Sequence, residues 1–85
     1  MLDKQFQEKC MEMQQKVLEE MQQAHQGNSV IPYSQLQSIL AELRAMQQYK
    51  GLSVSYSRMI VDAWAHSNAL GEELLKLAHL YNRLA

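Results

Sequence analysis

A seven-residue repeat of apolar side chains near the end of the chain constrains the fold most. Its members are Tyr56, Ala63, Leu70, Leu77 and Leu84. A second line of apolar residues falls four positions after members of the first and is interrupted only by Ser67; it consists of Ile60, Leu74 and Tyr81. Spacings of four and three residues are those of an α-helix that buries one side along its length. The rest of the chain must therefore supply a surface that covers this stripe.

Residues 2–26 are expected to form the first helix. They contain no Gly or Pro and are rich in Gln, Glu, Lys and Met, which lose little rotamer freedom in a helix. The apolar side of this helix consists of Leu2, Phe6, Cys10, Met13, Val17 and Met21. Met11 and Leu18 lie off that stripe, seven residues apart, and widen the apolar surface beyond what contact with one other helix needs.

A short loop is expected to join this helix to a second one, over about residues 33–50. Gly27 suits the left-handed conformation that ends a helix, and Pro32 suits the first turn of the next. Because the loop is short, the two helices should pack antiparallel as a hairpin. The apolar side of the second helix consists of Leu36, Ile39, Leu40, Leu43, Met46 and Tyr49.

A third helix is predicted over about residues 53–84, after a break or kink at Gly51 and with Ser53 placed to cap it. A continuous helix of that length measures about 45 Å, whereas a compact chain of this size has a radius of gyration near 12 Å. The third helix therefore either breaks near Ser67 to Gly71 and folds back as a fourth, or extends and is covered by another chain.

The fold class that these patterns predict is all-α. The whole chain, residues 1–85, forms one helical domain in which a hairpin is followed by a long third helix, straight or kinked, in an elongated bundle. A chain this short buries only about 60 to 65% of its unfolded surface. Disulfides within the chain are excluded because Cys10 is the only cysteine, so a partner is expected to add to a thin core.

Charge and hydropathy limit which partners and which cellular compartment the sequence predicts. The net charge is −1, and no segment carries the basic excess that neutralising nucleic-acid phosphates requires. The longest apolar runs are too short to span a membrane, and the N-terminus has no apolar stretch typical of a signal peptide. With a lone thiol that suits a reducing compartment, these features predict a cytoplasmic protein.

No pattern of residues predicts a catalytic or metal site. Zinc ligands occur at close paired spacings, and among Cys10, His25, His66 and His79 no two are that close. Asp62 and His66 are four residues apart, but this spacing is typical of a surface charge contact. Cys10 lies on an apolar stripe, where a free cysteine behaves as a small hydrophobic residue. We therefore expect no enzyme activity, no cofactor and no bound metal.

The paired carboxylates and the region around Gly51 each admit one further interpretation. The neighbours Glu19 and Glu20, like Glu72 and Glu73, point about 100° apart on a helix and cannot share a site. Gly51 could be the turn of a DNA-binding helix-turn-helix. The residues that would then meet DNA are Ser53, Ser55, Ser57 and Arg58, with Arg44 and Lys50 as the other cations nearby. Three cations make a weak electrostatic footprint on DNA.

The apolar stripe itself is the predicted partner interface, because nothing in so short a chain evidently covers it. Its candidate residues are Tyr56, Ile60, Trp64, Leu70, Leu74, Leu77, Tyr81 and Leu84. Trp64 lies at the edge of the stripe, where it is either a core aromatic or an interface anchor, since Trp and Tyr dominate interaction hot spots.

The hairpin loop and the helix after it resemble the needle-forming subunits of bacterial type III secretion systems and the small hairpin chaperones that guard those subunits. The residues that carry the resemblance are Asn28, Ser29, Pro32, Leu36, Leu43, Tyr49, Lys50, Arg58, Ile60 and Asp62. Needle subunits end shortly after the position of Asp62, whereas this chain continues to Ala85, and Gly51 stands where that family has a polar residue. The longer tail favours a chaperone or accessory component over a needle subunit.

Together the sequence predicts a small non-enzymatic protein-protein interaction subunit, adaptor or chaperone that acts through amphipathic helices. Its partner would be another protein or further copies of itself, and the resemblance implies a bacterial secretion assembly. The alternative function is that of a small helical DNA-binding transcriptional regulator.

Overall fold

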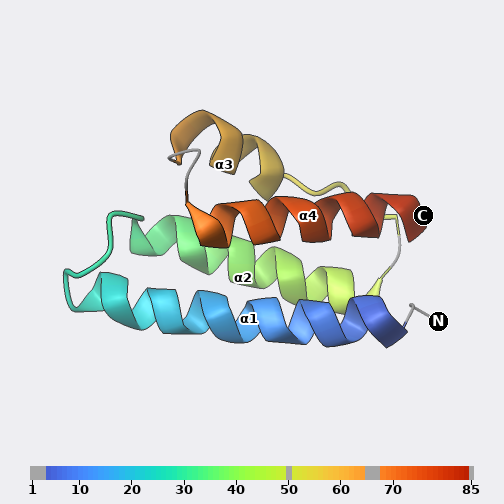
Figure 1. Ribbon diagram of the computed structural model, residues 1–85, viewed down its shortest axis with the longest axis horizontal. Helices are drawn as coiled ribbons and strands as arrows, with labels where there is room; N and C mark the ends of the chain where they lie inside the picture. The colour runs from blue at the N-terminus through green and yellow to red at the C-terminus, as the bar shows by residue number, and fades with distance from the viewer. Residues whose placement is uncertain (1–3, 50, 65–67, 85) are drawn as a thin grey trace.

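The computed structural model describes residues 4–49, 51–64 and 68–84, and this part of the chain folds into four α-helices without a strand (Figure 1). The helices are α1 (Lys4–His25), α2 (Tyr33–Gln48), α3 (Tyr56–Ala63) and α4 (Ala69–Leu84). The prediction of an all-α fold is confirmed. The molecule measures 39 × 22 × 18 Å with a radius of gyration of 12.4 Å.

Helices α1 and α2 form the predicted hairpin and lie side by side along the long axis (Figure 1). Gly27 has a φ of +80°. The amide of Gly27 donates to the carbonyl of Ala24, and the amide of Asn28 donates to the carbonyl of Gln23. This pair of bonds is the Schellman arrangement, which a left-handed glycine makes possible at the end of a helix. Pro32 directly precedes α2, with a φ of −61°.

The predicted third helix over residues 53–84 is not confirmed as one element, because the chain divides it into α3 and α4. Trp64, which follows α3, has extended backbone angles, and its amide donates the last helical bond to the carbonyl of Ile60. At the start of α4 the side-chain oxygen of Asn68 accepts a hydrogen bond of 2.9 Å from the amide of Gly71. Such a bond satisfies one of the free amides of a first helical turn. The fold-back expected as one of two alternatives is therefore the arrangement that the chain adopts.

The interruption between α2 and α3 is confirmed near Gly51, which has a φ of +75°. Ser55, rather than the expected Ser53, is the residue before α3. The carboxylate of Glu42 on α2 accepts hydrogen bonds from the Ser55 amide (2.7 Å) and the Ser55 hydroxyl (2.9 Å). The beginning of α3 is thereby tied to the middle of α2.

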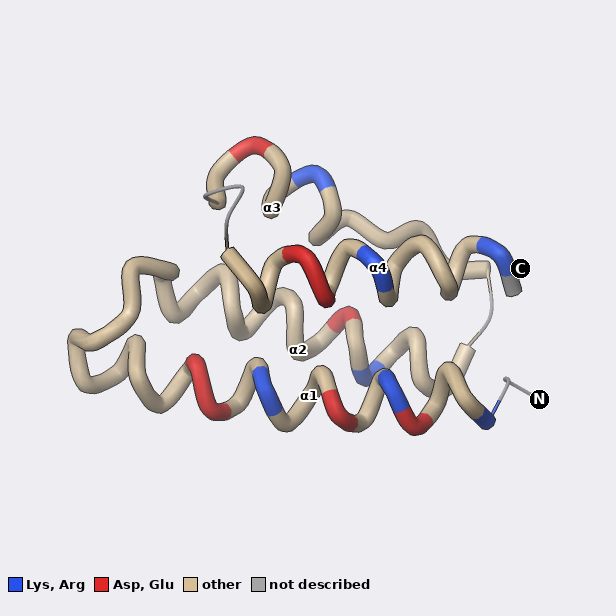
Figure 2. The backbone as a smooth tube through the Cα atoms, viewed as in Figure 1, with Lys and Arg blue, Asp and Glu red and all other residues tan. Residues whose placement is uncertain are grey.

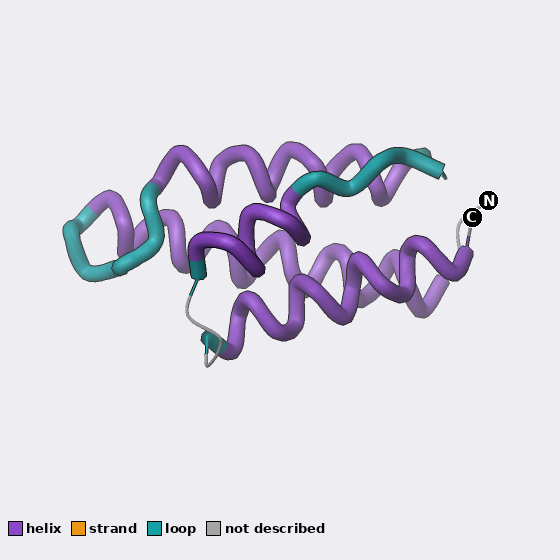
Figure 3. Tube along the Cα trace, turned by 90° about the horizontal axis from the view of Figure 1, so that it is seen from above, coloured by secondary structure: helices purple, strands orange, loops and turns teal. Residues whose placement is uncertain are grey.

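Helix α4 lies along α1, and the short α3 packs against α4 and α2 on the outside of the hairpin (Figures 1 and 3). The core between the helices consists of Phe6, Cys10, Met13, Val17, Met21, Ile31, Leu36, Ile39, Leu40, Leu43, Met46, Tyr56, Ile60, Trp64, Leu74, Leu77, Ala78 and Tyr81. Phe6 and Tyr81 bring α1 and α4 together, with their ring centroids 5.3 Å apart. All the predicted stripe residues of α1 from Phe6 onward are in this core; Leu2 lies outside the described residues.

Gly71 allows α4 to approach the end of α3 closely. A Cβ atom at this position would lie 3.1 Å from Cε3 of Trp64 and 3.2 Å from Cγ2 of Ile60. Contacts that short require the neighbouring side chains to move, and both of these side chains are buried. The glycine therefore sets the distance between α3 and α4.

Replacing Gly71 with leucine is expected to lower the free energy of unfolding by about 1–3 kcal/mol, because the added side chain overpacks the contact with Trp64 and Ile60. Urea unfolding followed by far-ultraviolet circular dichroism measures this difference. Ala69→Leu is the matched control, since Ala69 is exposed in the same helix, and it should change stability by less than about 0.5 kcal/mol. Equal stability of the two variants would contradict the tight approach at Gly71.

Candidate protein-interaction face

The stripe predicted as a partner interface is mostly covered by the chain itself. The residues of this set that are buried in the core are Tyr56, Ile60, Trp64, Leu74, Leu77 and Tyr81. Leu70 is half-buried and packs against the core, and the side chain of Leu84 lies outside the described residues. The sequence predicted an interface here because no cover was evident, and the hairpin together with the contact between α3 and α4 supplies that cover once α4 folds back.

The polar tips of the buried aromatic residues also have partners within the chain. The Tyr56 hydroxyl donates to the carbonyl of Leu74 at 2.8 Å, and the Trp64 indole N–H donates to Oε1 of Gln35 at 2.9 Å. Tyr81 donates its hydroxyl proton to the carbonyl of Tyr49. These bonds fix the rings in the core, so a surface for a partner has to be sought elsewhere on the molecule.

The candidate metal ligands are not brought together where the structure describes them. In residues 4–49, 51–64 and 68–84 no three His, Cys, Asp or Glu side chains form a group that could hold a metal ion. His66 of the Asp62 and His66 pair lies outside these residues. Asp62 instead contacts Nε of Arg58 at 3.8 Å, on the exposed side of α3.

Cys10 is fully buried between α1 and α2, as its place on the apolar stripe predicted. Its Sγ atom donates to the carbonyl of Leu43 at 3.2 Å, and the side-chain amide of Gln14 contacts the sulfur at 3.7 Å. Burial raises the pKa of the thiol, and the Gln14 contact opposes this only in part. Because the thiolate is the nucleophilic form of cysteine, this environment keeps the sulfur unreactive.

Alkaline pH is expected to destabilise the fold through Cys10 and Tyr56. Burial raises the pKa of both groups above their ordinary values of 9.0 and 10.0, so both stay protonated in the folded chain after the unfolded chain has begun to ionise. The contribution of these two groups to the free energy of unfolding should be constant below about pH 9. Above that pH it should fall by up to about 1.4 kcal/mol per pH unit for each group. Urea unfolding from pH 8 to 11 measures the slope.

The variant Cys10→Ala combined with Tyr56→Phe provides the control for this pH dependence. It removes both ionisable groups, so its stability should fall less steeply above about pH 9 than that of the unaltered protein. The same slope in both proteins would show that neither group is responsible.

The helix-turn-helix interpretation finds little geometric basis in the described residues. The connection from α2 to α3 runs from residue 49 to residue 55, which is longer than the three- or four-residue turn of that motif. Arg58 is engaged with Asp62 on the same helix, and Arg44 lies on α2; Lys50 falls outside the described residues. The alternative of a DNA-binding regulator therefore stays a sequence-based prediction.

One end of the bundle is free of charged residues. Residues 21–41, which comprise the last turn of α1, the loop and the first half of α2, contain no Lys, Arg, Asp or Glu. In Figure 2 this end has no blue or red segment, and the charged residues of α1 lie nearer to its N-terminus. Lys16 among them contacts Glu73 of α4 at 2.8 Å and Glu12 at 3.5 Å. Lys16 thus pairs with α4, whereas the last turn of α1 and the first half of α2 form an uncharged side.

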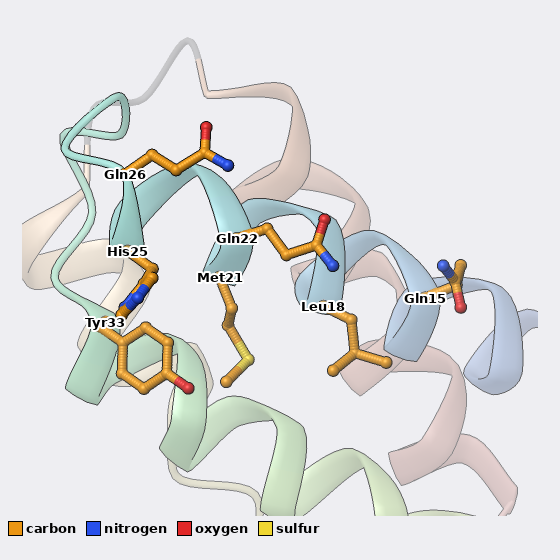
Figure 4. A pocket seen from close by; sticks show the side chains of 7 residues that line it. All are labelled: Gln15, Leu18, Met21, Gln22, His25, Gln26 and Tyr33. Atoms are coloured by element: carbon orange, nitrogen blue, oxygen red, sulfur yellow. The ribbon is translucent and has the colours of Figure 1, made fainter.

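A hollow of about 750 Å³ lies on that uncharged side, where α1 meets the beginning of α2 (Figure 4). The residues that line it are Gln15, Leu18, Met21, Gln22, His25, Gln26 and Tyr33. Leu18 and Met21 point from α1 toward α2, and Tyr33 lies beside His25, with 6.4 Å between the ring centroids. We call these seven residues the uncharged face.

Met11 extends the apolar character of α1 beyond this hollow. It lies four residues before Gln15 and seven before Leu18, so it shares their side of the helix. Its side chain is 59% exposed, and that of Tyr33 is 43% exposed. An apolar floor of Leu18, Met21 and Tyr33 is therefore bordered by glutamine amides and by one further exposed apolar side chain.

The sequence contained two signals for this surface. Met11 and Leu18 stood out as apolar residues off the core stripe, and the structure places both on the side of α1 that α4 does not cover. The absence of charge from residues 21–41 was the second signal, and it is unusual for exposed helix surface. The predicted interface residues and the uncharged face have no residue in common.

Comparison with protein-family models, with curated proteins and with solved structures finds no match to this chain. In the part of the chain that the structure describes, no helix combines the length and the apolar character needed to cross a membrane. The assignment of a function therefore depends on the surface of the chain itself.

Proposed function

We propose that the protein is a small non-enzymatic interaction subunit, adaptor or chaperone that contacts a protein partner through the uncharged face. The observation that carries this proposal is the hollow of about 750 Å³ with an apolar floor and a rim of glutamines. Interfaces between proteins have few charged residues at their centre, and Tyr and Met are enriched there. The uncharged face has this composition.

Exposure of the apolar residues supports the same proposal. Tyr33 and Met11 leave large apolar side chains in water although the helices to which they belong bury their other side well. Apolar residues that gather on one face rather than scattering singly are typical of interaction sites. A partner that covers them would gain the hydrophobic free energy that the isolated chain leaves unused.

We further propose that the partner belongs to a bacterial secretion assembly. This part of the proposal rests on the sequence pattern of the hairpin alone, which resembles needle subunits and their chaperones of type III secretion systems. The loop residues that carry the resemblance, Asn28 to Pro32, border the uncharged end of the bundle.

A photoreactive amino acid placed at Gln22 should capture the partner in cells of the source organism. Gln22 lines the hollow and is exposed, so a bound protein lies within reach of the reactive group. We expect discrete crosslinked species that disappear when Leu18→Glu places a charge on the apolar floor. The measurement is the mass of each species by gel electrophoresis and mass spectrometry.

The same photoreactive amino acid at position 58 provides the matched control, because the Arg58 side chain is 91% exposed on α3 and away from the uncharged face. It should give none of the species obtained at position 22. Absence of species at position 22, or identical species at both positions, would refute the proposed function.

A further inference from the structure

We propose that the uncharged face binds a second copy of this chain, with Met11 of each copy inserted into the hollow of the other. This inference rests on the proposed function and names its partner. Met11 is an exposed apolar side chain, and the hollow is large enough for such a side chain. Both lie on the same side of α1. One side of α1 therefore carries both halves of a contact, Met11 and the part of the hollow that α1 lines.

Two-fold symmetry makes this contact reciprocal. The centre of the hollow on α1 lies near residue 20, about 13 Å along the helix from Met11 at 1.5 Å per residue. Two antiparallel α1 helices related by an axis near Gln15 place each Met11 over the other copy's hollow. In such a dimer the same patch is used on both copies: each copy inserts its Met11 and receives the Met11 of the other. The flexible thioether of methionine suits an irregular hollow.

The chemistry of the rim favours a second copy over a charged partner. Each glutamine amide both donates and accepts hydrogen bonds, so Gln15, which lies at the axis, can pair with Gln15 of the other copy. With the axis near Gln15, residues 21–26 of one copy lie opposite residues 5–10 of the other, and because residues 21–26 have no carboxylate or cation they bring no like charge against Glu8 or Lys9. Glu12 at the border is already held by Lys9 and Lys16, at 3.6 and 3.5 Å.

The size of the face predicts a reversible dimer. Residues 11–26, all but the last of them in α1, extend about 24 Å, and two helices side by side are about 20 Å wide, which gives about 500 Å² on each copy. The total of about 1,000 Å² is at the lower limit of specific interfaces. We therefore expect an equilibrium between monomer and dimer rather than a permanent assembly.

Sedimentation velocity of the purified chain tests the dimer, over protein concentrations from about 10 μM to about 1 mM, the range expected for so small an interface. The average mass should rise from one copy to two. Met11→Glu should raise the dissociation constant at least tenfold without changing the helix content, because the side chain is exposed and packs in no core. Val61→Glu is the matched control on α3, 56% exposed, and should dimerise like the unaltered chain.

Disulfide formation between two single variants tests the orientation. When Met11→Cys and Gln22→Cys chains are mixed and oxidised, a disulfide between the two kinds of chain should form, whereas Met11→Cys alone should give much less. Each chain carries only one of the two added cysteines, so a disulfide between positions 11 and 22 always joins two chains. Cys10 is fully buried and remains in place.

The two proposals fail in different ways. A monomer at every concentration, or equal effects of Met11→Glu and Val61→Glu, overturns the second copy as partner. If crosslinking at Gln22 then captures a different protein in a Leu18-dependent manner, the proposed function stands with another partner. If the dimer forms but the disulfide joins two Met11→Cys chains more efficiently than a Met11→Cys chain and a Gln22→Cys chain, the reciprocal insertion of Met11 is refuted.

Discussion

Three buried aromatic side chains determine where α3 and α4 lie, because each must find a hydrogen-bond partner for its polar tip inside the protein. Tyr56 bonds the backbone of α4, Trp64 bonds the side chain of Gln35 on α2, and Tyr81 bonds the backbone after α2. Each bond joins segments far apart in the sequence, and each ring fills the core beside the α1–α2 hairpin. The second half of the chain is thus positioned by directional bonds, while the hairpin itself depends mainly on apolar contact between its stripes.

The sequence predicted the hairpin almost completely, because its signals are local: a glycine in the left-handed region, a proline before the next helix and two apolar stripes. It gave the division between α3 and α4 only as one of two alternatives. Tyr56 and Leu70 are two heptads apart and stay in register across the break, so periodicity alone cannot distinguish one helix from two that fold onto each other. Asn68 is the local signal for a new helix start, and it acts through a bond to Gly71 that only the folded chain shows.

The site could be predicted less well than the fold. An apolar stripe shows that something covers it, but the sequence does not say whether the cover is the same chain, and here the packing of the four helices buries six of the eight residues expected at an interface. The sequence indicated the uncharged face only in part, through Leu18 and through Met11 at its border. Its hollow exists because Tyr33 at the start of α2 meets the last turns of α1, and this juxtaposition depends on the geometry of the loop.

The close approach at Gly71 has a consequence for how this sequence can change over evolutionary time. The indole of Trp64 occupies the space that a side chain at position 71 would need. A larger residue at 71 therefore becomes acceptable only after, or together with, a smaller one at 64, so the two positions are energetically coupled. The order of the two substitutions matters: shrinking the indole first leaves a cavity that the second change fills, whereas the reverse order passes through an overpacked intermediate.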